Sequence, residues 1–221
     1  MTDDETASRT DKMVDAFVDR LLRTGIDGLG KLDSAREVAT AALASERNSD
    51  DAIDAIVSSH TKLAATGGFV TGLGGFVTLA VALPANVVGF YVLATRMVAS
   101  IAAVRGHDVT RDDVRTAVLL AVTGEDATDI VRKAGGGAIV GKATSVALGK
   151  LPPAALMAVN KGVAFRIFVR LSQKGLGRLG RMVPIAGGVV GGGLDAYFMR
   201  RIAKHAREDF PPIGLPQLTS G

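Results

Sequence analysis

Residues 60–104 read HTKLAATGGFVTGLGGFVTLAVALPANVVGFYVLATRMVASIAAV, and no charged side chain occurs from Leu63 to Thr95. A single helix over these uncharged positions would be about 50 Å long, whereas the hydrocarbon core of a bilayer is roughly 30 Å thick. The stretch therefore does not predict one simple membrane span. Glycines fill its first half and Pro84 divides it, so we expect two apolar helices, with Pro84 at the first helical position of the second.

The composition predicts a core built mainly from small side chains. Apolar residues make up 48% of the 221 residues, aromatic residues only 5%, and there are 27 glycines and no tryptophan. The absence of cysteine excludes disulfides, thiolate metal ligands and thiol nucleophiles. The first residues, MTDDETASRTDK, are acidic and polar, whereas a signal peptide begins with a basic segment followed by an apolar one. We therefore expect a cytoplasmic protein.

Hydrophobic periodicity and capping residues predict helices before and after the apolar stretch. Before the stretch we expect a helix over residues 11–23 that Gly25 and Gly28 end, a helix capped by Asp33 or Ser34 that ends near Ser45, and a helix capped by Ser49. After it we expect a helix that Thr110 and Asp113 open as a capping box and that ends at Gly124. A short helix over residues 126–134 and a helix that starts at Pro152-Pro153 follow. No segment alternates with period two over a convincing length, so we expect no sheet.

These elements predict an all-α fold, namely a compact helical domain built on the glycine-rich apolar hairpin, with amphipathic N-terminal helices. We expect three parts along the chain: an acidic extension over residues 1–48, a helical domain over residues 49–210, and a flexible tail rich in proline and glycine over residues 211–221.

The charge is distributed unevenly. Residues 1–62 have 8 basic and 13 acidic side chains (net −5), residues 63–134 have 6 of each, and residues 135–221 have 12 basic and 3 acidic (net +9). Two interpretations remain open. Either the basic half meets an anionic partner, or the acidic N-terminal helices fold back onto it.

The helix after Pro152-Pro153 carries most of the basic residues that could form one surface. Arg166, Arg170, Lys174 and Arg178 recur every four residues, so they share one helix face if the helix continues past Gly175. Lys161 and Arg181 lie near this face. A basic amphipathic helix can bind anionic headgroups or an acidic partner. The alternatives are a solvated face, or one paired with acidic residues of the N-terminal helices.

A second glycine-rich segment covers residues 183–201. In it, Gly187 and Gly191 are four residues apart, as are Gly188 and Gly192. Glycines at this spacing remove side chains from one helix face and allow another backbone to approach closely. We expect this segment to dock on the first apolar hairpin.

Few residues are candidates for chemistry. Residues 136–143 nearly match the phosphate-binding loop GxxxxGK[ST], but Ala143 replaces the required hydroxyl and the preceding residues predict a helix instead of a strand. His60, His107 and His205 have no partner at a helical metal-site spacing. Asp195 lies in an apolar segment, where it either has a function or pairs with a neighbouring cation. We expect no enzymatic activity, no metal and no cofactor.

Three segments resemble the marker regions of a known family. They are HTKLAATGGFVTGLGGFVTLAVALPANV (residues 60–87), RMVASIAAVRGHDV (residues 96–109) and VPIAGGVVGGGLDAYFMRRIAKHAREDF (residues 183–210). They resemble the EcsC family of bacterial proteins, which is named after a member encoded beside an ABC transporter. The resemblance covers roughly Ala52 to Phe210. It implies a helical fold and an association with membranes or transport, and it supplies no catalytic residue.

We therefore expect a non-enzymatic protein that binds lipid or the anionic inner face of the membrane as a peripheral protein, with a link to ABC transport. The alternative is a soluble regulatory subunit that docks an acidic protein partner, such as a transporter, through its basic face. Nucleic acid is not an expected partner, because the chain has no recognised binding motif and few aromatic residues that could stack on bases.

The apolar stretch also predicts a groove for an acyl chain. Residues seven positions apart lie near one helix face on either side of Pro84, and those expected to border the groove are Phe69, Phe76, Leu83, Phe90 and Met97. Each buried methylene of a bound chain would contribute about 0.8 kcal/mol. The alternative is that these side chains pack against neighbouring helices of a closed core.

Overall fold

The computed structural model describes residue 12 and residues 16–66, 85–123, 130–131, 133, 148–178 and 186–213. For residues 85–87, 164, 167–178 and 186–192 it describes the backbone alone. The elements of this part are η1, a π-helical turn at Arg23–Asp27, and the helices α2 (Ala35–Ser45), α3 (Ser49–Thr66), α4 (Ala85–Val104), α5 (Asp112–Thr123), α8 (Pro153–Arg178) and α9 (Ala186–Asp209).

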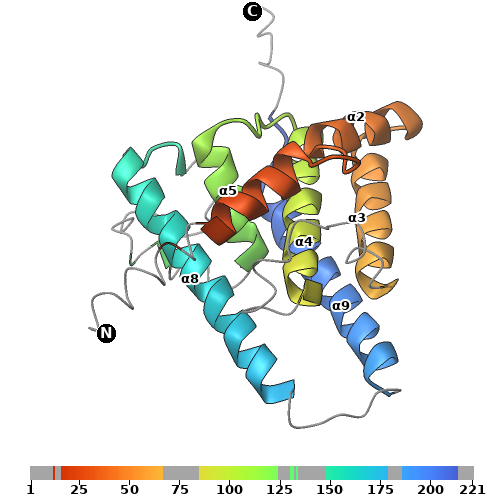
Figure 1. Ribbon diagram of the computed structural model, residues 1–221. Helices are drawn as coiled ribbons and strands as arrows, with labels where there is room; N and C mark the ends of the chain where they lie inside the picture. Colours follow the sequence, from red (N-terminus) through yellow and green to blue (C-terminus); the bar gives the residue numbers. More distant parts are fainter. Residues whose placement is uncertain are drawn as a thin grey trace, which may run out of the picture.

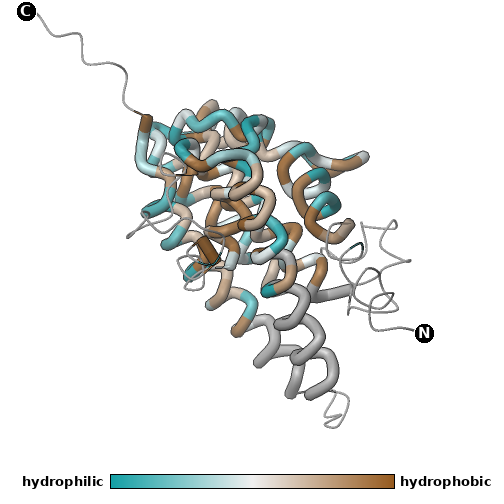
Figure 2. Tube along the Cα trace, turned by 90° about the vertical axis from the view of Figure 1, so that its left-hand side faces the viewer, coloured by the Kyte–Doolittle hydropathy of each residue, from teal (hydrophilic) through white to brown (hydrophobic). Residues whose placement is uncertain are grey.

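The packed elements are all helical, which confirms the predicted all-α class. In the described part, pairing between extended segments is limited to one isolated bridge, Leu29 with Leu32. Figure 1 shows the helices packed around α4, and hydrophobic and hydrophilic residues alternate along the outer helices in Figure 2.

Helix α4 is the centre of the core. It contacts η1, α2, α3, α5 and α9, and every residue from Tyr91 to Ser100 is buried. The second half of the apolar stretch is therefore a helix that protein covers on all sides from Tyr91 to Ser100. The first half, with its glycines and Pro84, lies outside the described residues. Among those that are described, no helix combines the length and hydropathy needed to cross a bilayer.

The N-terminal helix continues further than its glycines predict. Helical structure is present from residue 16 and passes through η1, so that Gly25 lies inside a helical turn. Gly28, with φ +81°, ends it. A Cβ at Gly25 would lie 2.8 Å from Thr95 Cγ2 of α4. Gly25 is therefore a packing residue and not the end of the helix.

The expected start of α2 is confirmed. The Ser34 hydroxyl accepts a hydrogen bond from the Glu37 backbone N–H (3.2 Å), and the Glu37 carboxylate accepts one from the Ser34 N–H (2.7 Å). This reciprocal pair is a capping box. Helix α3 is capped by Asn48 instead of Ser49, because Asn48 Oδ1 accepts from the N–H groups of Asp50 and Asp51, both at 2.9 Å.

The turn between α4 and α5 differs from its predicted form. Gly106, at φ +88°, ends α4 as expected. Helix α5 begins at Asp112, however, and the Thr110 hydroxyl donates to Asp108 (2.7 Å) instead of capping the helix with Asp113. Asp113 accepts hydrogen bonds from Arg111. The Thr110 side chain therefore bonds locally to Asp108, two residues before it, and does not form the predicted capping box.

Helices α8 and α9 form one end of the molecule. Helix α8 begins at Pro153 and continues past Gly175, as the basic-face interpretation requires. It packs on α5, whereas α9 packs on α3, α4 and α5. The lower ends of both helices in Figure 1 extend beyond α3, α4 and α5.

The acidic N-terminal segments pack into the same structure as the rest of the chain. Phe17, Leu21 and Ala35 belong to the core that α4 and α5 form. At the other terminus, the Ile213 N–H donates to the Arg105 carbonyl (3.0 Å), so the first residues after α9 are held against the end of α4. The expected tail beyond residue 213 lies outside the described residues.

Candidate functional site

The outer part of α8 is the first candidate surface. Val159 and Val163 are buried, and a Cβ at Gly162 would meet Ile130 Cγ2 at 3.0 Å, so this side of the helix faces the core. At about 100° per residue, Arg166, Arg170, Lys174 and Arg178 lie on the same side, further along the helix. The side of α8 that is apolar beside α5 therefore becomes basic where the helix extends beyond α5.

The structure separates the predicted basic residues into two groups. Arg166 is exposed at the start of the basic row, whereas Lys161, also exposed, lies on roughly the opposite side of α8 with exposed Met157 and Phe165. The backbone of α8 carries Arg170, Lys174 and Arg178, whose side chains lie outside the description, as does Arg181 altogether.

Of the residues expected to border an acyl-chain groove, Phe90 and Met97 are described. Phe90 is half-buried against the core, and its ring contacts that of Tyr91 edge-on at a centroid distance of 5.6 Å. Met97 is fully buried. Phe69, Phe76 and Leu83 lie outside the described residues. A pocket of about 310 Å³ lies apart from Phe90 and Met97, at the C-terminal end of α4, and its lining includes Asn48, Arg105 and Ile213.

A buried polar cluster lies where α2, α3 and α4 meet. Arg96 of α4 has a side chain only 9% exposed and lies 3.6 Å from Asp33, just before α2. Burial lowers the pKa of the Arg96 guanidinium, while Asp33 and Glu37 oppose that effect. Sequence reasoning missed Arg96, although it is the one charged residue between Lys62 and Arg105. A single charged residue within a long uncharged stretch is the sequence feature that could have identified Arg96.

His60 of α3 is part of this cluster. Its Nδ1 is 2.8 Å from the Ile56 carbonyl, which can only accept, so Nδ1 carries the proton in the neutral ring. Nε2 is then an acceptor, and it is buried without a hydrogen-bond partner in the described part of the chain. Burial lowers the His60 pKa to about 4; the bond to Ile56 opposes this and the charge of Arg96 adds to it.

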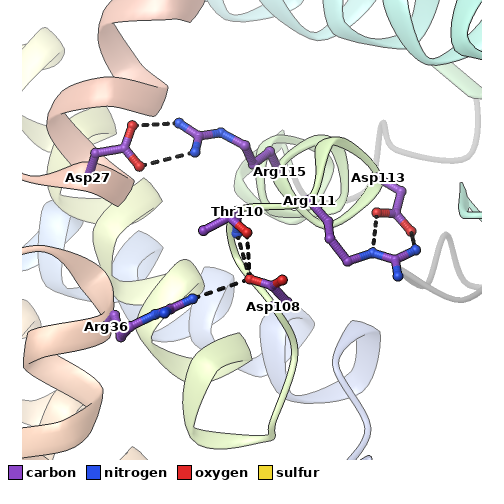
Figure 3. Close-up of polar contacts among 7 residues, drawn as sticks. All are labelled: Asp27, Arg36, Asp108, Thr110, Arg111, Asp113 and Arg115. Carbon is purple, nitrogen blue, oxygen red and sulfur yellow. Dashed lines mark hydrogen bonds and ion pairs between the residues drawn. The ribbon is translucent and has the colours of Figure 1, made fainter.

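A second polar group, drawn in Figure 3, joins the N-terminal segments to α5 and the turn before it. Arg115 donates to both carboxylate oxygens of Asp27 (3.0 and 2.7 Å), and Arg36 donates to Asp108 (3.2 Å). Hydrogen bonds from Thr110, with smaller effects of Arg36 and Arg111, lower the pKa of Asp108. These groups are exposed or half-exposed, and their geometry is that of interhelical ion pairs.

The acidic N-terminal segments do fold back onto cations of the later chain. Asp50 of α3 accepts from Arg105 (2.9 Å), and Asp54 of α3 accepts from Arg207 of α9. Of these pairs, the one with Arg207 reaches the strongly basic part of the chain, after residue 134. The internal interpretation of the charge asymmetry thus holds for Arg207, whereas the side chains of Arg170, Lys174 and Arg178 lie outside the described part of the chain.

The remaining candidates for chemistry occupy structural positions or lie outside the described residues. His107 Nε2 donates to the Pro211 carbonyl (2.8 Å), and His205 is half-buried on α9. Asp195 is half-buried and takes part in a polar interaction. In the described ranges, no three histidine or acidic side chains are grouped as a metal ion requires. Residues 136–143 lie outside these ranges.

A helical fold with an apolar central helix and a glycine-rich α9 agrees with the sequence resemblance. The model of the EcsC protein family matches residues 6–210. The chain belongs to the EcsC protein family. The match includes η1 and α2, so the family's common region begins earlier than the resemblance from Ala52 indicated. No curated protein and no solved structure matches this EcsC chain significantly.

Proposed function

We propose that this EcsC-family protein is a non-enzymatic, peripheral protein that binds an anionic membrane surface. The observation that carries the proposal is the course of α8, which extends beyond α5 with basic residues at every fourth position on one side. Electrostatic attraction stabilises a row of cations on a protruding helix at an anionic surface, by about 1 kcal/mol for each Lys or Arg near the headgroups.

The other side of α8, in its first half, carries exposed apolar side chains beside a cation, which favours a membrane over a nucleic acid or a free anion. Phe165 is 57% exposed and Met157 63%, beside exposed Lys161. Large apolar side chains among cations suit the boundary between headgroups and acyl chains, where both kinds of group are stabilised. The linkage to ABC transport and the peripheral location at the inner membrane face remain part of this proposal.

The experiment is sedimentation with phosphatidylglycerol–phosphatidylcholine vesicles. Changing Arg166, Arg170, Lys174 and Arg178 together to Gln should abolish binding without changing the helical content measured by circular dichroism. The matched control changes Arg23, Lys31, Arg36 and Arg47 to Gln, which removes the same number of charges from the region of η1 and α2. That variant should bind almost as the parent does.

Binding of the parent should also weaken as salt rises, because the Debye length falls from about 10 Å at 0.1 M to about 3 Å at 1 M. Equal binding by the parent and the α8 variant would contradict the proposal. A parent that ignores vesicles but is retained by an acidic protein partner would favour the regulatory-subunit alternative.

A further inference from the structure

The outward side of α9 carries an exposed apolar patch. Leu194 is 43% exposed, Tyr197 57% and Phe198 36%, and their spacing of three and four residues places them on one side of the helix. The rings of Tyr197 and Phe198 meet edge-on with centroids 5.6 Å apart. The other side of α9 is the core side, where Met199, Ile202, Ala203 and Ala206 are buried.

Cations follow this patch on the same outward side. Arg200, Arg201 and Lys204 are all exposed, one to two turns after Tyr197. Of the acidic residues on α9, Asp195 is half-buried toward the core side, and Glu208 is exposed in the last turn, four residues after Lys204. Before the patch, residues 182–194 contain no charged side chain. From its start, the face therefore passes from uncharged to aromatic, then to cationic, then to acidic.

We infer that this face of α9, from Leu194 to Lys204, is a second contact with the anionic bilayer. Leu194, Tyr197 and Phe198 enter between the headgroups, and Arg200, Arg201 and Lys204 bind the lipid phosphates. Aromatic rings with a polar edge are stabilised at the interface, and neighbouring cations keep their charge near water and phosphate. The inference rests on the proposed function, because it assigns a further surface to the same partner.

The geometry sets the orientation of α9 on the membrane. From Leu194 to Lys204 the helix rises about 15 Å, whereas each headgroup layer is roughly 5–8 Å thick. Both ends of the face can lie within that layer only if α9 is inclined toward the membrane plane. Leu194 is then deepest and Glu208 farthest from the phosphates. The end of the molecule that α8 and α9 form in Figure 1 lies against the lipid.

A competing occupant exists within the chain. The uncharged residues from Leu63 to Leu83 are apolar enough to cover the patch on α9. The two possibilities, cover by this segment and contact with lipid, predict different exposure of the side chain at position 197 to water when vesicles are absent. An internal cover would shield it already, whereas a membrane-binding face would leave it in water until lipid is added.

The chain contains no tryptophan, so a single introduced indole reports on one position. With Tyr197→Trp, we expect emission typical of a solvated indole in buffer, a shift to shorter wavelength on adding phosphatidylglycerol-containing vesicles, and quenching by lipids brominated on the acyl chain. The control is Leu43→Trp on α2, where Leu43 is 43% exposed. Its emission should change little, and brominated lipid should not quench it.

A second variant tests the cations. Arg200→Gln with Lys204→Gln should weaken vesicle binding by roughly 30-fold, which corresponds to about 1 kcal/mol for each charge. Lys31→Gln with Arg47→Gln is the control of equal charge and should bind as the parent does. Both pairs should leave the melting temperature nearly unchanged, because surface cations contribute little to stability.

The outcomes separate this inference from the proposed function. If the parent binds vesicles but the indole at position 197 is not quenched, the α9 contact is wrong and the proposed function stands. The same holds if the indole is already shielded in buffer and Tyr197→Ser lowers the melting temperature, because the chain itself then covers the patch. If the parent does not bind vesicles at all, both are overturned.

Discussion

Gly25 shows how one residue without a side chain can fix the distance between two helical segments. A Cβ at this position would lie 2.8 Å from Thr95 Cγ2 and 3.2 Å from the Val92 carbonyl oxygen of α4. Gly25→Ala should therefore lower the free energy of unfolding by about 1–3 kcal/mol, because η1 must move away from α4. Denaturant unfolding followed by circular dichroism measures this difference.

The matched control is the same substitution at an open helical glycine. A Cβ at Gly193 of α9 would meet nothing within 4 Å. Gly193→Ala should leave stability unchanged or raise it by up to about 1 kcal/mol, because alanine favours the helix. If the two variants unfold alike, the close approach of η1 to α4 is wrong.

At the scale of an element, α2 depends on its cap. The Ser34 hydroxyl and the Glu37 carboxylate satisfy each other's backbone N–H groups at the start of the helix. Ser34→Ala removes one partner of this pair and should lower the free energy of unfolding by about 1 kcal/mol. Chemical denaturation of the parent and the variant would show a lower midpoint with an unchanged slope.

Ser45→Ala, at the other end of α2, provides the comparison. Its hydroxyl donates to the Ala42 carbonyl (3.2 Å) from an exposed position and caps no free N–H group. We expect a change within about 0.5 kcal/mol. A loss at Ser45 as large as that at Ser34 would show that the effect is not one of N-terminal capping.

At the scale of the whole molecule, His60 makes stability depend on pH between its two pKa values. In the folded protein its pKa is about 4, against an ordinary value of 6.5. Between these values the unfolded chain binds the proton and the folded chain does not, so the free energy of unfolding rises with pH. The free energy of unfolding should have its full value above pH 6.5 and should decrease by on the order of 3 kcal/mol as the pH falls from 6.5 to 4.

Equilibrium unfolding at several pH values checks this, with His60→Gln as the variant. The variant should lose most of the slope between pH 4 and 6.5. A second loss of stability should remain in both proteins below about pH 4, because the pKa values of Glu37, Asp108 and Asp113 are lowered in the folded state. An unchanged slope in His60→Gln would mean that other groups cause the dependence.

Local features of this fold could be predicted from sequence because their causes lie within a few residues. Ser34 with Glu37, Gly106 and Pro153 stop or start helices through bonds and backbone angles that neighbouring residues set. The predictions failed at Gly25, where α4 packs closely through Thr95, and at Thr110, whose hydroxyl bonds to Asp108 instead of capping α5.

The sequence by itself determined the all-α class, the central place of the second half of the apolar stretch and the membership of the EcsC family. Hydrophobic periodicity and the absence of charge are properties of the chain alone, and they require a buried helix. Tertiary structure alone decided that Arg96 and His60 are buried together, and that the side of α8 carrying Val159 and Val163 faces the core. Burial depends on which helices meet, and residues far apart in the sequence set that arrangement.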